Sequence, residues 1–65
     1  MNDYTNEVIR AVEAEATARM KKGNKMDMMI AVAWASGYAG HRGIDLLVFF
    51  EALEEMYRRK LLKGA

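Results

Sequence analysis

The chain has 65 residues, 52% of them hydrophobic and 29% charged, with a formal net charge of +1, no cysteine and one histidine. This composition excludes an intrinsically disordered chain, and the small charge excludes a polycation that would bind nucleic acid through net charge alone. A single helical domain over residues 1–65 is expected to bury only about 60% of its unfolded surface, and without disulfides or metal ligands its remaining route to stability is oligomerisation.

The first expected helix runs from about residue 3 to residue 22. Asn2 or Asp3 can cap its amino end, and lysines fill its last turn before Gly23, where they complement the helix dipole. Apolar residues recur every three or four positions, which is the pattern of an amphipathic helix with one buried face. They are Val8, Ile9, Val12, Ala16 and Met20.

The second expected helix covers residues 25–36, with Asn24 as its amino-terminal cap. Every position from 28 to 35 is apolar, a pattern that suits a buried strand as well as a helix. Alanine and methionine are strong helix formers, and Gly37 follows where a helix cap is expected. We therefore predict a helix that ends before Gly37.

The stretch GYAGHRG, residues 37–43, is predicted to be a loop between the second and third helices. It holds the only histidine, His41, which together with Arg42 gives the chain its best candidate for acid–base chemistry. The chain has no cysteine and a single serine at a helix end, and the loop lacks the ending of a phosphate-binding motif. We interpret it as a turn and predict no catalytic residue, cofactor or metal ion.

The third expected helix covers residues 45–63. Glu54 with Arg58, and Glu55 with Arg59, are predicted to form ion pairs across one helical turn. A second set of apolar residues recurs at intervals of three and four and is predicted to face the core. It comprises Leu46, Phe50, Leu53, Tyr57 and Leu61.

The second helix, and residues 46–50 at the start of the third, are apolar around their whole circumference. A helix of this kind needs cover on all sides, which two neighbouring helices of one short chain do not provide. We therefore expect an all-α three-helix unit that associates as a helical homodimer or higher oligomer. The predicted interface residues are Met29, Val32, Trp34, Leu47, Phe49 and Phe50.

If the three helices alternate in direction, most of the basic residues gather at one end of the bundle. The predicted contacts for phosphates or an acidic partner are Lys21, Lys22, Lys25, Arg58, Arg59 and Lys63. The alternative is that these cations complement helix dipoles on a solvated surface. The sequence thus favours a non-enzymatic adaptor, inhibitor or regulator that acts by protein–protein interaction, with a nucleic-acid-associated regulator as the alternative.

The amino-terminal segment carries acidic residues within its first seven positions and is not followed by an apolar core, so a secretory signal is not expected. The longest apolar run has eight residues, whereas a membrane-spanning helix needs about 20. A soluble, cytoplasmic protein without a membrane partner is the expectation, and the lack of cysteine is compatible with a reducing compartment.

Overall fold

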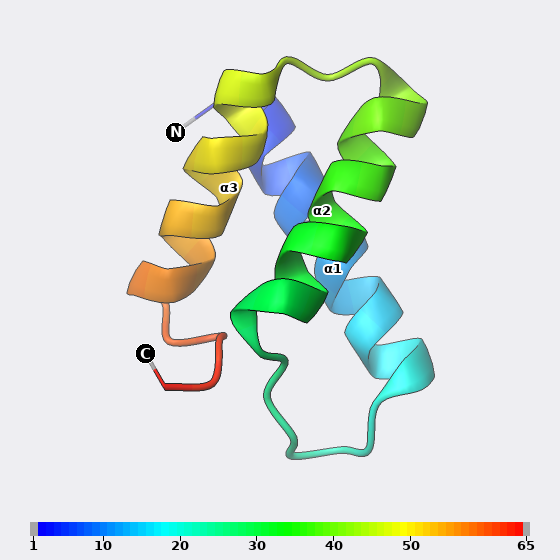
Figure 1. Ribbon diagram of the computed structural model, residues 1–65, viewed down its shortest axis with the longest axis vertical. Coiled ribbons are helices and arrows are strands. Elements are labelled where there is room, and N and C mark those ends of the chain that lie inside the picture. Colours follow the sequence, from blue (N-terminus) through cyan, green and yellow to red (C-terminus); the bar gives the residue numbers. More distant parts are fainter. Residues whose placement is uncertain (1, 65) are drawn as a thin grey trace.

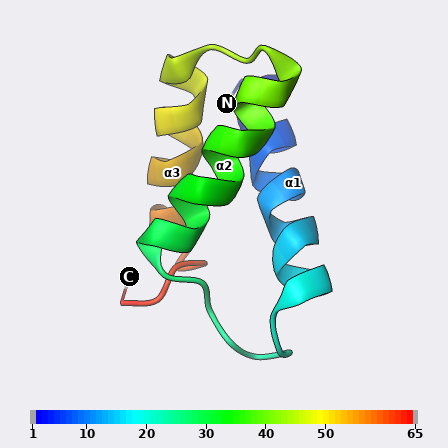
Figure 2. The ribbon, with the colours of Figure 1, turned by 45° about the vertical axis from the view of Figure 1, so that its right-hand side comes forward.

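A computed structural model describes residues 2–64 and shows three α-helices that run in alternating directions (Figure 1). Helix α1 spans Asp3–Arg19, α2 spans Met28–Arg42 and α3 spans Leu46–Arg58. Each helix packs against the other two, and α2 lies over both of its neighbours (Figure 2). The expected all-α three-helix domain is confirmed. Within residues 2–64, no helix has the length and apolar character needed to cross a bilayer.

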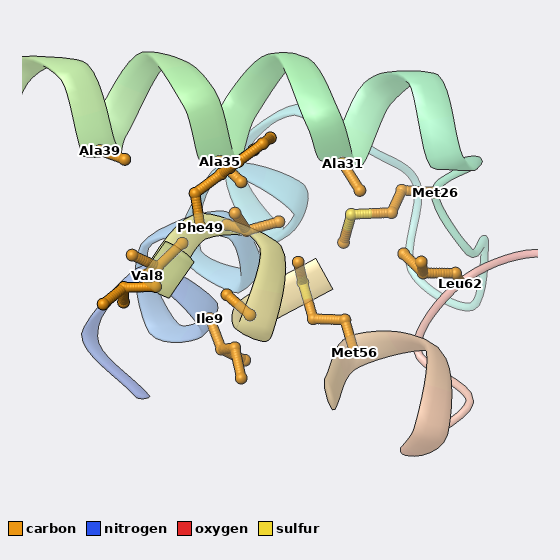
Figure 3. Packing of buried hydrophobic residues seen from close by; sticks show 12 residues of the cluster. Val8, Ile9, Met26, Ala31, Ala35, Ala39, Phe49, Met56 and Leu62 are labelled. Carbon is orange, nitrogen blue, oxygen red and sulfur yellow. The ribbon is translucent and has the colours of Figure 1, made fainter. Parts of the chain in front are cut away.

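The core lies between the three helices and combines large side chains from α1 and α3 with small ones from α2. Alanines alone form the fully buried stripe of α2, so this helix approaches its neighbours closely. Figure 3 shows Phe49 and Met56 of α3 on the core side of α2, with Phe49 close to Ala35. The buried apolar residues are Val8, Ile9, Val12, Met26, Ala31, Ala35, Ala39, Val48, Phe49, Ala52, Met56 and Leu62.

The predicted loop over residues 37–43 is wrong, because α2 continues through Arg42. The helix begins at Met28 instead of residue 25, and its cap is Asp27 instead of Asn24. The Asp27 carboxylate accepts a hydrogen bond from the amide of Ile30 at 2.8 Å. Its end comes at Gly43, which adopts the left-handed conformation (φ 71°) that glycine tolerates best. A helical glycine costs only about 1 kcal/mol relative to alanine, and burial of Ala39 stabilises the added turns.

The first and third helices are both shorter than predicted. Helix α1 ends at Arg19 instead of residue 22, and α3 ends at Arg58 instead of residue 63. After α3, Lys60 takes a left-handed conformation (φ 59°) and turns the chain back toward α2. Leu62 then pairs with Met26 in an isolated β-bridge, and both side chains are buried. Burial of these two apolar side chains stabilises this return over further helical turns.

The predicted core face of α3 is also wrong. Of the five residues expected to face the core, Leu46, Phe50 and Tyr57 are each more than half exposed, while Leu53 and Leu61 are partly buried. The buried residues of α3 are Val48, Phe49, Ala52, Glu55 and Met56. Glu55 is tolerated on the buried side because Arg58 and Arg59 donate to its two oxygens at 2.6 and 2.7 Å.

Candidate interaction face

A group of large apolar side chains is exposed on α2 and α3. We call this group the α2–α3 face. Its members expose between 37% and 83% of their surface. They are Met28, Met29 and Val32 of α2, with Leu46, Leu47, Phe50 and Tyr57 of α3.

The α2 part of the face lies toward α3. Trp34 and Tyr38 of α2 line a groove together with residues of α1, so this flank of the helix faces α1. On the helical circumference, Met28 and Val32 lie across the buried alanine stripe from those two residues. They therefore occupy the flank of α2 that is turned toward α3.

The α3 part of the face lies toward α2 by the same reasoning. Glu51 and Glu55 of α3 share a small pocket with Thr5 of α1, which marks the flank of α3 that faces α1. Leu46 and Phe50 lie on the far side of the buried stripe of α3. Leu46, Phe50 and Tyr57 thus lie on the side of α3 away from α1, as Met28 and Val32 do on α2. Leu47 precedes Glu51 by one turn and lies on the flank of α3 that faces α1.

No charged side chain interrupts the α2 part of the face, since the sequence from Met28 to Gly40 contains no Asp, Glu, Lys, Arg or His. The exposed residues of this stretch are all apolar, small or hydroxyl-bearing. The solvent-facing side of a surface helix normally carries charged and polar residues. This surface therefore has the composition of the interior or of an interface.

The predicted interface residues divide into three groups. Met29, Val32, Leu47 and Phe50 belong to the α2–α3 face. Trp34 is partly buried in the groove beside α1. Phe49 is only 6% exposed and belongs to the core, so we leave it out of the interface. The predicted interface omitted Met28, Leu46 and Tyr57. Leu46 and Tyr57 had been assigned to the core.

An open concavity of about 470 Å³ lies between α1 and α2. Its lining combines small residues with two aromatic side chains and two polar ones. They are Ala11, Ala14 and Glu15 of α1, with Ala33, Trp34, Gly37, Tyr38 and His41 of α2. The groove is an open surface between two packed helices.

A polar cluster joins the start of α1 to the end of α2. The carboxylate of Glu7 accepts a hydrogen bond from the Tyr38 hydroxyl and two from the Arg42 guanidinium, at 2.7 and 3.2 Å. The Arg42 hydrogen bonds, followed by that of Tyr38, hold the pKa of Glu7 below its ordinary value, and the pKa of Arg42 is raised in turn. Tyr38 and Arg42 are four residues apart on one helical face, a signal that the predicted loop concealed.

The Glu7 cluster predicts a specific loss of stability in acid. Because the pKa of Glu7 is lower in the folded protein than in the unfolded chain, the folded state binds fewer protons there. Its contribution is present above the ordinary pKa of 4.5 and is lost as the pH falls through the folded value. In Glu7→Gln, we expect lower stability near neutral pH and a shallower decline below pH 4.5, measured by urea unfolding across pH.

Glu13→Gln is the matched control for this measurement. Glu13 is an exposed carboxyl on the same helix, and its side chain makes no ion pair within residues 2–64. An equal flattening of the acid decline in both variants would contradict a specific role for the Glu7 cluster.

The end of the molecule opposite this cluster carries five exposed lysines, which we call the lysine pole. Figure 1 shows the end of α1, the start of α2 and the end of α3 at this end of the bundle. Of the predicted contacts, Arg58 and Arg59 are engaged with Glu54 and Glu55, which confirms the expected pairs. The lysine pole comprises Lys21, Lys22, Lys25, Lys60 and Lys63, none of which forms an ion pair within residues 2–64.

His41 lies on the last turn of α2 and is exposed. Its side chain has no hydrogen bond or ion pair to any other residue in the range 2–64. The same range contains no cluster of three or more histidine, cysteine or acidic side chains with the geometry of a metal site.

No known protein family, curated protein sequence or solved structure matches this chain.

Proposed function

We propose that this is a non-enzymatic helical protein that acts through protein–protein interaction as a homo-oligomer, in its simplest form a dimer. The observation that carries the proposal is the α2–α3 face, which combines seven exposed large apolar side chains with an uncharged stretch of α2. Full burial of one such side chain contributes about 1.5–3 kcal/mol. Leaving the face in water therefore forgoes stability comparable to that of the whole domain.

The size of the face supports a second copy as its cover. At roughly 200 Å² for a complete large side chain, the six residues of the face that lie away from α1 expose on the order of 700 Å². That area is about what each partner contributes to a standard protein interface. Most homo-oligomers are two-fold dimers, in which the same surface is used twice. An adaptor, inhibitor or regulator that works as a dimer in the cytoplasm is the role we propose.

Sedimentation velocity of the full chain over a wide range of micromolar concentrations tests this proposal. We expect the mass of two chains at the upper concentrations and dissociation toward one chain on dilution. A folded species with the mass of one chain at every concentration would overturn the proposal.

The second candidate is a regulator that uses the lysine pole to bind nucleic-acid phosphates. It is favoured by the convergence of five lysines without an ion-pair partner at one end of the bundle. Titration of labelled duplex DNA at two salt concentrations tests it, because phosphate contacts require affinity to fall as salt rises. Absence of binding at low salt would exclude this role.

A further inference from the structure

The solvent-facing side of α2 carries a stripe of four residues at intervals of four, three and four. They are Met29, Ala33, Ser36 and Gly40, and all four are exposed. This spacing places them in one row along the helix, which is the arrangement of a helix–helix contact. The row lies within the uncharged stretch of α2, so it is suited to contact another helix without burying a charge.

The two halves of α2 differ in the size of their exposed side chains. The amino-terminal half of the helix projects the large side chains of Met28, Met29 and Val32. Toward the carboxyl end, the row presents Ser36 and Gly40 and is flat. Large side chains at one end and backbone at the other make a surface that fits an inverted copy of itself.

Gly40 has no explanation within a single subunit, whereas Gly37 lines the groove between α1 and α2. Neither Gly37 nor Gly40 has a positive φ, and a Cβ atom added at either would meet nothing within 4 Å. Each costs about 1 kcal/mol relative to alanine in a helix interior. Glycine at such positions permits close approach of another backbone or side chain from outside.

We infer that two copies pair through antiparallel α2 helices about a two-fold axis near Ala33 and Ser36. Met29 then lies over Gly40 of the partner subunit, and Ala33 lies against Ser36 of the partner subunit. This inference rests on the proposed self-association and specifies its geometry. The exposed side chains of α3 that lie away from α1, including Leu46 and Phe50, extend the contact beside α2.

Charge also favours the antiparallel arrangement. The lysine pole lies at the amino end of α2 (Figure 1), whereas Asp3 in the first turn of α1 and Asp45, the cap of α3, lie at the opposite end of the bundle. Parallel pairing sets two lysine poles side by side, which is repulsive. It also stacks Met29 on Met29 of the partner subunit and leaves a gap at Gly40. Antiparallel pairing separates the lysine poles and fills that gap.

Cysteine crosslinking tests the geometry, because the chain has no cysteine of its own. Met29→Cys and Gly40→Cys are prepared as separate full-length proteins and are oxidised alone and as an equal mixture. We expect disulfide-linked dimers in the mixture and almost none in either protein alone. Residues 29 and 40 are about 16 Å apart along the helix, beyond the roughly 7 Å that a disulfide spans between Cα atoms.

The controls separate the failure of the geometry from the failure of self-association. A mixture of Met29→Cys with Ala18→Cys, which carries its thiol on the exposed side of α1, measures random collision. Crosslinking of each protein alone would overturn the antiparallel arrangement in favour of a parallel one. An uncrosslinked mixture that sediments as a dimer would overturn the α2 contact and leave self-association intact. An uncrosslinked mixture that sediments as a monomer would overturn both.

Discussion

Truncation of Phe49 to alanine is expected to lower the free energy of unfolding by about 3–5 kcal/mol, which is most of the stability of a domain of this size. Phe49 is 6% exposed and lies close to Ala35 in the core, so its removal leaves a cavity between α2 and α3. Phe50, its neighbour in sequence, is 55% exposed. The same truncation at Phe50 is expected to cost less than about 1 kcal/mol in the isolated subunit.

Urea unfolding followed by circular dichroism checks this difference between adjacent phenylalanines. The measurement is made at dilution, where a dimer would not add to the apparent stability of the Phe50 variant. If Phe49→Ala does not fold, Phe49→Leu supplies a milder loss of about 1–1.5 kcal/mol. A larger loss at Phe50 than at Phe49 would mean that α3 turns the opposite face to the core.

The apolar pattern of the sequence did not determine which side of α3 faces the core. Leu46, Phe50 and Tyr57 make an apolar row at helical spacing, and so do Phe49, Ala52 and Met56. Periodicity identifies a helix but does not choose between two apolar rows on it. The buried side of α3 includes the charged Glu55, whose pair with Arg59 was predicted and whose second pair, with Arg58, was not.

The helices themselves were predictable, and their ends were less so. The buried residues Val8, Ile9 and Val12 of α1 follow directly from the spacing of apolar residues. The extension of α2 was missed because glycines were given more weight than the continuing alanine row, which reaches Ala39. The pairing of Leu62 with Met26 depends on the left-handed conformation of Lys60, which a lysine in the sequence does not predict.

Part of the candidate interface was also predictable, since Met29, Val32, Leu47 and Phe50 were identified from apolar excess alone. The number of apolar residues indicates how much surface must be buried. It does not show which row of residues on a helix faces outward. The row of small residues on the carboxyl-terminal half of α2 could not be predicted from the sequence for a related reason. Once Gly37 and Gly40 were assigned to a loop, they had no bearing on helix packing, and the geometry of the row emerged only with the helix continued to Arg42.

Substitution of Gly40 by leucine is expected to change folding and association in opposite directions. In the isolated subunit, Gly40 is exposed and the space at its Cβ position is open, so leucine is expected to raise the free energy of unfolding by about 0.8 kcal/mol. In the antiparallel dimer, the new side chain occupies the space of Met29 of the partner subunit. We expect dimer affinity to fall on the order of 100-fold, which corresponds to about 2.8 kcal/mol.

Ala18→Leu is the matched control, since it adds a large apolar side chain to an exposed position on α1, outside the proposed contact. Sedimentation gives the dimer affinity of both variants, and urea unfolding at dilution gives the stability of the subunit. A structural role for Gly40 within one subunit predicts that stability and association fall together. The antiparallel contact instead requires a more stable subunit that associates less, with the affinity of Ala18→Leu unchanged. A Gly40→Leu protein that dimerises as well as the native chain would contradict the close approach of a second helix at this position.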